Sequence, residues 1–164
     1  MRRGEGSNRK VRSDKKVDVK PTMSLELKEK LYGFAYLSNE PVKDAAERLC
    51  TKGAMSEEVI TDIRQWFRRD YHRPYNITKG YSYRPKLQLV MNGEKSKVTI
   101  KFPQENYDLL CKVAYALDLP PTSTATVLIK ITLANYEFMH EYIRFYLKHL
   151  DQERITEIKR FLKI

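Results

Sequence analysis

The chain contains one internal repeat, and this repeat constrains its fold more than any other feature. Residues 22–49 (TMSLELKEKLYGFAYLSNEPVKDAAERL) align without a gap on residues 101–128 (KFPQENYDLLCKVAYALDLPPTSTATVL), at an offset of 79 residues. Few residues are identical. The order of features is nevertheless shared: a short strand, a helix, a tight turn with proline and a second helix. A unit this short cannot bury its own apolar face, so we expect the two copies to fold together.

The strand of the second copy, KVTIKF (Lys97–Phe102), alternates apolar and polar side chains. Because successive strand residues point to opposite faces, one face is apolar and the other carries two lysines and a threonine. Antiparallel pairing of the two copies would form a two-stranded ribbon whose inner face caps a core of four helices. We expect three residues of this strand on the inner face (Val98, Ile100, Phe102) and three on the outer face (Lys97, Thr99, Lys101).

The first copy departs from this regular pattern. Asp18, Lys20 and Thr22 would occupy its outer face, and Pro21 lies within the strand. Proline cannot donate to a strand ladder, so we expect this strand to be short or poorly paired. We favour pairing of the two copies within one chain over pairing with a second chain. The first arrangement sets Asp18 opposite or diagonal to Lys101, a mildly favourable pair.

Helix start and stop signals divide the remaining chain. Ser24, Pro41 and Ser56 begin helices, and Gly53 can end the second one. Residues 68–86 form a basic, tyrosine-rich linker without a regular period. Residues 86–90 (KLQLV) favour a strand and Asn92-Gly93 a turn.

A long helix is expected to follow residue 123 and reach residue 150, and an amphipathic helix capped by Asp151 follows it. Two interpretations of this C-terminal region stay open. It packs back on the same core, or it provides a face for self-association. The sequence thus divides into a disordered basic arm (1–16), a first repeat with an extra helix (17–67), a linker with a possible hairpin strand (68–96), a second repeat (97–150) and a C-terminal helix (151–164).

Positive charge is concentrated in two places. The net charge is +10; residues 1–20 carry eight Lys/Arg against three acids, and residues 64–101 carry ten against two. An excess of one sign favours a polyanionic partner. No apolar run approaches the length of a membrane span, and we expect a cytoplasmic protein.

Catalytic and metal chemistry find little support in the sequence. The three histidines lack Cys or carboxylate partners at metal-ligand spacing, and there is no Gly-rich phosphate loop. The stretch RRDYHRPY is too local for a tyrosine nucleophile acting on DNA. The positions of Cys50 and Cys111 are typical of packing cysteines. We expect no enzyme activity, metal, cofactor or small-molecule substrate.

The alternating KVTIKF, the break at Pro103 and the turn LDLPPTST before a helix together resemble the ribbon-helix-helix family of DNA-binding proteins. The resemblance implies a mainly α fold with a short antiparallel ribbon, present as two tandem copies with extra C-terminal helices. It also implies that the outer strand residues contact bases in the major groove: Lys97, Thr99, Lys101, Asp18, Lys20 and Thr22.

The same resemblance implies that the start of the second helix of each copy binds a DNA phosphate. The residues are Pro41, Val42 and Lys43 in the first copy and Thr122, Ser123 and Thr124 in the second. Basic residues of the linker are further candidates for phosphate contacts: Arg68, Arg69 and Arg73.

The function expected is sequence-specific binding of double-stranded DNA. The chain would act as a transcriptional regulator such as a repressor, or as a plasmid- or phage-type accessory factor in partition or transfer. Two alternatives stay open: a basic adaptor or RNA-binding module, and an α+β domain in which residues 86–100 are only a surface hairpin.

Overall fold

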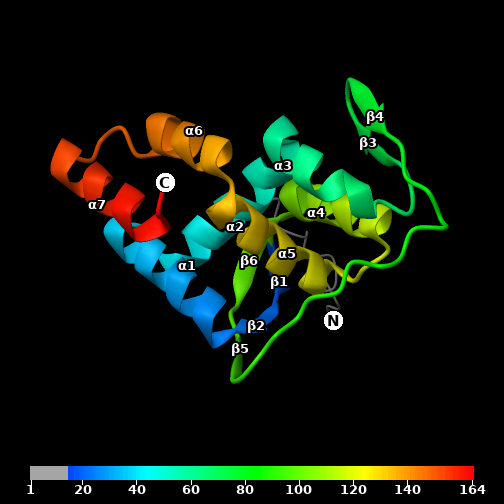
Figure 1. Cartoon of the computed structure of the whole chain (residues 1–164), viewed down its shortest axis with the longest axis horizontal. Coiled ribbons are helices and arrows are strands. Elements are labelled where there is room, and N and C mark those ends of the chain that lie inside the picture. Colours follow the sequence, from blue (N-terminus) through cyan, green and yellow to red (C-terminus); the bar gives the residue numbers. More distant parts are fainter. Residues whose placement is uncertain (1–14) are drawn as a thin grey trace, which may run out of the picture.

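The structure is a computed structural model that describes residues 15–164; most of the basic arm expected at residues 1–16 lies outside the described residues. The described part is mainly helical, with seven α-helices and short antiparallel strands (Figure 1). Its first half begins with β1 (Lys16–Val19), β2 (Thr22–Ser24), α1 (Leu25–Leu37) and α2 (Val42–Met55). Its second half contains β5 (Lys95–Lys97), β6 (Ile100–Pro103), α4 (Gln104–Leu117) and α5 (Pro121–Ala134).

The offset of 79 residues is preserved in the structure. Shifting α2 by this offset gives the bounds of α5, and shifting α1 gives α4 to within one residue. The turns between the paired helices also match, since Asn39 and Asp118 both adopt left-handed backbone conformations, with φ of 58° and 60°. Each donates its N–H to the carbonyl of the tyrosine three residues earlier, at 3.1 Å. The paired helices and the turns between them therefore recur at this offset.

The strands of the two halves pair within one chain. β1 pairs with β6 and β2 pairs with β5, both antiparallel. The register does not slip between the two pairs, and the Val98 N–H donates to the Pro21 carbonyl between them (3.1 Å). Residues 16–24 and 95–103 thus form one continuous unit, called the ribbon below. The Lys20–Pro21 step interrupts the ladder, as expected, without ending the pairing.

The register places Lys20 opposite Thr99, its counterpart at the offset of 79. A second pair of counterparts, Gly53 and Thr132, meets where α2 packs against α5: a Cβ on Gly53 would lie 2.6 Å from Thr132 Cγ2. In a symmetric arrangement, a residue meets its own counterpart only on a two-fold axis. The two halves are therefore related by an approximate two-fold axis through both pairs.

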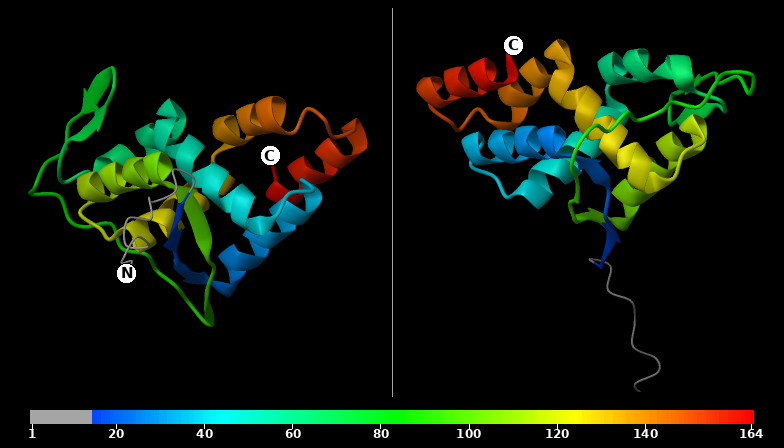
Figure 2. Two further views of the ribbon diagram at one scale, coloured as in Figure 1. Left: turned by 180° about the vertical axis from the view of Figure 1, so that it is seen from behind. Right: turned by 60° about the horizontal axis from the view of Figure 1, so that its bottom comes forward.

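The core lies between the ribbon and the helices of the two repeats. On the inner face of the ribbon six apolar side chains are buried, and five of them pack with buried residues of the four helices. These five are Val19, Met23, Val98, Ile100 and Phe102, and the sixth is Pro21. In Figure 2 (right) the ribbon lies on the lower side of the molecule, with the helices above it. The ribbon is consequently one outer layer of the described protein.

The connection between the halves agrees with the expectation only in part. It begins with α3 (Glu57–Ile63), the helix expected after Ser56, and the 3₁₀ turn η2 (Arg64–Trp66); the linker then forms an unexpected hairpin of β3 (Tyr71–Arg73) and β4 (Asn76–Thr78). The strand expected at residues 86–90 is absent. The prediction of a surface hairpin over residues 86–100 is wrong, because β5 and β6 pair with β2 and β1 instead.

The single long helix expected after residue 123 is also wrong. Asn135 leaves the helical conformation (ψ 113°) and caps α6 (Tyr136–Tyr146), accepting from the Phe138 N–H at 2.9 Å. Its Nδ2 donates to Asp62 of α3 at 2.7 Å. This contact fixes the break between α5 and α6.

The C-terminal helix α7 (Gln152–Leu162) packs back on α1, with Ile158 and Leu162 buried (Figure 1). This is the first of the two open interpretations; self-association through this region stays a prediction. The caps expected at Ser24, Ser56 and Asp151 are confirmed. Gly53 does not end α2, which continues to Met55. No helix within residues 15–164 has the length and apolarity needed to cross a membrane.

Candidate nucleic-acid interface

The outer face of the ribbon carries the polar residues expected there. Lys97 and Lys101 are exposed and Thr99 is half-buried, whereas the intervening Val98 and Ile100 are buried. On the other strand, Asp18 and Lys20 are exposed and Thr22 is half-buried. The structure therefore brings all six expected base-reading residues onto one surface.

A shallow groove joins this surface to the start of α2. Its volume is about 650 Å³, and it is lined by both strands, by α1 and by the turn before α2. The strand residues that line it are Asp18, Lys20, Lys97, Val98, Thr99 and Lys101, and the helix and turn residues are Tyr32, Pro41, Val42 and Lys43. Five of the six expected base contacts, all but Thr22, thus share one groove with the first expected phosphate site.

An ion pair bridges the two strands on the outer face. Lys101 Nζ donates to Asp18 Oδ1 at 2.9 Å, and the two residues are opposite each other in the register. The hydrogen bond from Lys101 holds the pKa of the Asp18 carboxyl below its ordinary value. Both side chains are about half exposed (48% and 47%), so the pair contributes little to stability. The pair lies on the outer face, where both side chains are accessible to a bound partner.

The start of α2 presents backbone donors toward the groove. The Pro41 carbonyl accepts from Asp44 and Ala45, which begins the helical ladder. The N–H groups of Val42 and Lys43 precede that ladder and have no carbonyl of the helix to bond. No side chain among the described residues caps this helix. Two free N–H groups and the helix dipole make a site suited to an anion.

The start of α5 offers fewer donors than expected. Thr124 is fully buried, and both its N–H and its hydroxyl donate to the Pro120 carbonyl at 3.0 Å. Thr124 therefore has no donor left for a phosphate. Pro121, the first residue of α5, has no N–H. The N–H groups of Thr122 and Ser123 are the ones that remain available at this end.

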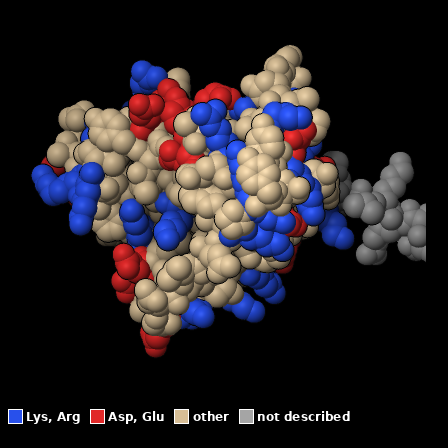
Figure 3. Space-filling view, turned by 45° about the vertical axis from the view of Figure 1, so that its right-hand side comes forward, with Lys and Arg blue, Asp and Glu red and all other residues tan. Residues whose placement is uncertain are grey.

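Arg68 and Arg69 lie beside the turn that precedes α5. Arg68 Nε and Arg69 Nη2 contact Asp118 at 3.1 and 3.0 Å, and Lys86 Nζ lies 3.8 Å from the same carboxylate. Although burial raises the pKa of Asp118, the cations Arg69, Lys86 and Arg68 hold it below its ordinary value overall. Three positive charges on one carboxylate leave a local excess, and Figure 3 shows Lys and Arg gathered on this side.

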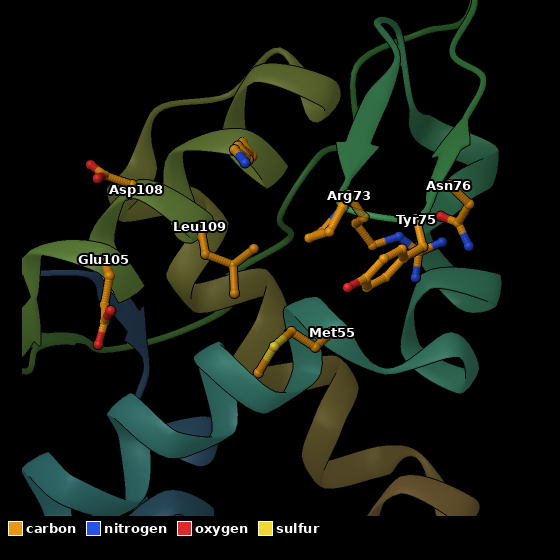
Figure 4. A pocket seen from close by; sticks show the side chains of 9 residues that line it. Met55, Arg73, Tyr75, Asn76, Glu105, Asp108 and Leu109 are labelled. Carbon is orange, nitrogen blue, oxygen red and sulfur yellow. The ribbon is translucent and has the colours of Figure 1, made fainter.

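Arg73 does not join the ribbon. It belongs to β3, where its guanidinium contacts Glu57 of α3 and Thr78 of β4. It lines a separate cleft of about 480 Å³ between the β3–β4 hairpin, α4 and the end of α2 (Figure 4). Glu105 and Asp108 stand on the wall opposite the hairpin. The wall of α4 carries these two acids against one cation, Lys112, and Arg73 is already paired with Glu57, so the cleft is less suited to phosphate than the groove beside the ribbon.

Three residues of the outer surface were not expected from the sequence. Lys16 and Lys95 extend the outer face at its ends, both exposed. Two features of the sequence indicate these two lysines. One is the alternation of Lys95, Ser96 and Lys97, and the other is the offset of 79 that links Lys16 to Lys95. Tyr32 lines the groove from α1, with Lys28 over its ring at 5.4 Å. Only the packing of α1 against the ribbon reveals Tyr32.

The two cysteines are both free, Cys50 buried and Cys111 half-buried. Burial raises the pKa of the Cys50 thiol far above its ordinary value, which keeps it protonated and unreactive. Within residues 15–164 no cluster of His, Cys, Asp and Glu has an arrangement that could hold a metal ion.

Comparison of the chain with protein-family models, with curated proteins and with solved structures gave no match in any of the three. Its function is therefore inferred from the geometry of the chain itself.

Proposed function

We propose that the chain is a tandem ribbon-helix-helix protein that binds double-stranded DNA sequence-specifically and inserts the ribbon in the major groove. The observation that carries this proposal is the approximate two-fold axis through Lys20 and Thr99. It centres a two-stranded ribbon with a polar, basic outer face on a scaffold of two equal halves. The major groove of B-DNA is wide enough for a two-stranded ribbon.

The outer face has the chemistry for base reading. Lysine donates to guanine O6 and N7, and threonine either hydrogen-bonds a base or places its methyl against that of thymine. Including the two end residues, the outer face has five lysines against one acid. An excess of this kind also supplies the non-specific attraction to phosphate that DNA binding requires.

The starts of α2 and α5 support the proposal from either side of the ribbon. On the first side, the free N–H groups of Val42 and Lys43 open onto the same groove as Lys97 and Thr99. On the second side, Arg68 and Arg69 stand next to the turn before α5. Phosphate contacts at both ends would fix the ribbon's position along the groove, while the strand residues supply sequence preference.

We place this activity in regulation: the chain would act as a repressor, or as an accessory factor that marks a site for partition or transfer. The site sequence would then lie near its own gene. Footprinting on DNA that flanks the gene tests this, and protection of one defined segment is the expected result.

The direct test of binding uses duplex titrations at several salt concentrations. We expect a steep fall of affinity with salt and a large ratio of specific to non-specific binding. Lys97→Ala should lower the specific affinity, whereas Lys148→Ala, an equal loss of charge beyond the end of α6, should not. Equal affinity for duplex DNA, RNA and scrambled sequences would contradict the proposal and favour a general basic module.

A further inference from the structure

The two-fold relation exposes one break in symmetry on the outer face. The offset of 79 makes Asp18 the counterpart of Lys97 and Thr22 the counterpart of Lys101. The register pairs Asp18 with Lys101 on one side of the axis and Thr22 with Lys97 on the other. One side therefore holds an acid and a lysine in contact, and the other holds a threonine and a lysine.

We infer that Asp18 and Lys101 together read a single C·G base pair, and that this contact sets the orientation of the protein on its site. The inference rests on the proposed function. Lys101 would donate to guanine O6 and N7, and the Asp18 carboxylate would accept from cytosine N4. Each of these pairings is an established way to read a base edge, and here the two groups already lie side by side.

The spacing of the two groups fits such a base pair. Lys101 Nζ and Asp18 Oδ1 are 2.9 Å apart. Guanine O6 and cytosine N4 are hydrogen-bonded to each other in the base pair, so they are separated by about 2.9 Å as well. Lys101 can therefore donate to guanine O6 while Asp18 accepts from cytosine N4, and the ion pair between the two side chains stays intact.

A T·A pair fits less well, although it also presents an acceptor beside a donor. Thymine offers lysine one acceptor, O4, with a methyl group beside it, whereas guanine offers two acceptors. The carboxylate on adenine N6 would lie next to N7, a second acceptor that repels it. Both differences favour C·G.

The opposite side cannot make the same contact. Thr22 is half-buried, and its carbonyl accepts from Thr126 Oγ1 at 2.9 Å, which ties this strand to α5. Thr22 and Lys97 carry no carboxylate to accept from cytosine. If the duplex bound in the reverse orientation, its C·G pair would face Thr22 and Lys97 in place of Asp18 and Lys101. The ion pair therefore distinguishes the two orientations.

The test is selection of bound duplexes from a randomised library by the full chain, followed by titration of the selected duplex. The variants are Asp18→Asn, Lys101→Ala and, as a matched control, Asp44→Asn, which removes one negative charge from the exposed first turn of α2. The wild-type chain should select one C·G pair and bind it roughly tenfold better than T·A at that position. Both Asp18→Asn and Lys101→Ala should lose this preference, and Asp44→Asn should keep it.

The outcomes distinguish a failure of the inference from a failure of the proposed function. A selected motif that Asp18→Asn leaves unchanged would overturn the inference and leave the proposed function standing. If Asp18→Asn changes the affinity for all duplexes by the same factor, Asp18 acts through its charge alone. That result would also overturn the inference and leave the proposed function standing. If the wild-type chain enriches no sequence, the proposed function fails, and the inference fails with it. Melting curves of the variants serve as the folding control: because Asp18 is about half exposed, Asp18→Asn should melt with the wild-type chain.

Discussion

Gly53 and Thr132 lie in contact where α2 packs against α5, although 79 residues separate them in the chain. A Cβ on Gly53 would lie 2.6 Å from Thr132 Cγ2, closer than any side chain tolerates. Because the two residues are counterparts in the repeat, the approximate two-fold axis passes between them. Glycine on one side and threonine on the other let the two helices approach at a point where two equal larger side chains would collide.

Replacing Gly53 with alanine should destabilise the protein. Alanine favours the helix by about 1 kcal/mol, but crowding in a packed core costs about 1–3 kcal/mol, so a net loss is expected in the free energy of unfolding. Thr132→Ser removes the Cγ2 methyl and keeps the hydroxyl that donates to the Leu128 carbonyl at 2.7 Å. Denaturant curves of both single variants and the double variant form a cycle, and serine should rescue part of the alanine defect. Strict additivity of the two changes would contradict the contact.

Ile100 and Lys101 are neighbours in β6 with opposite expected roles. Ile100→Ala should lower the free energy of unfolding by about 2–5 kcal/mol, because it truncates a fully buried side chain. Lys101→Ala should leave the melting curve nearly unchanged and weaken specific DNA binding by about 1–3 kcal/mol. Melting curves paired with titrations on specific and scrambled duplexes check both. If Lys101→Ala weakens both duplexes equally, Lys101 contacts phosphate rather than a base.

The intrachain ribbon predicts a defined cross-link. Cysteines introduced at Lys20 and Thr99, which lie opposite each other in the register, should form a disulfide within one chain. Cys111→Ser should be included in the background because that thiol is only half-buried. Mass spectrometry and non-reducing gels measure the product. Covalent dimers in place of cross-linked monomers would show that the strands pair between chains.

Tyr71 links the β3–β4 hairpin to the end of α2 and makes stability depend on alkaline pH. Its hydroxyl donates to the Ala54 carbonyl at 2.6 Å, and burial raises the pKa of Tyr71 from 10.0 to about 12. Below pH 10 the Tyr71 hydroxyl is protonated in both the folded and the unfolded state, so its full contribution to stability is present. Between about pH 10 and about 12 only the unfolded state releases it, so the free energy of unfolding falls as the pH rises.

Tyr71→Phe should reduce that fall and, at neutral pH, cost about 1–3 kcal/mol, because the Ala54 carbonyl is left without its partner. Denaturant titrations across this pH range measure both effects. Tyr75→Phe is the matched control, since Tyr75 is 98% exposed in the same hairpin. A pH dependence identical in the wild type and Tyr71→Phe would show that Tyr71 does not titrate between the two values.

Removal of residues 1–14 tests the contribution of the basic arm to DNA binding. These residues include five Lys/Arg. For each phosphate that the arm neutralises, its removal should reduce the slope of log affinity against log salt by about 0.9. The preferred sequence should stay the same, since the outer face of the ribbon is intact. An unchanged slope would show that the arm neutralises no phosphate.

The sequence predicted the ribbon well because two signals agree. An alternation of period two assigns each strand residue to a face, and the internal repeat identified the segment of the first half that corresponds to the second strand. The break at Asn135 was missed because the apolar band of residues 127–146 continues through it. A contact with Asp62 of α3, distant in the chain, decides the end of that helix.

The β3–β4 hairpin was missed for a different reason. Its turn, Pro74-Tyr75, lacks the glycine or asparagine that marks the commonest tight hairpins. Gly53 was expected to end a helix, which is the usual local meaning of glycine, whereas its actual position is set by the approach of α5. Thr124 was expected to contribute to a phosphate site at a helix start, but tertiary packing buries that residue. For the hairpin the usual local signal was absent, whereas at Gly53 and Thr124 tertiary packing overrode a local signal.

Because the two halves are connected in one chain, pairing of the ribbon strands does not depend on the protein concentration. Two separate chains must find each other, so a ribbon shared between them falls apart at low concentration. Here each strand is held near its partner by residues 25–94 at a fixed effective concentration. A single molecule therefore keeps its ribbon however few copies surround it. A substitution on one strand also alters one edge of the ribbon only, so the two edges are free to diverge.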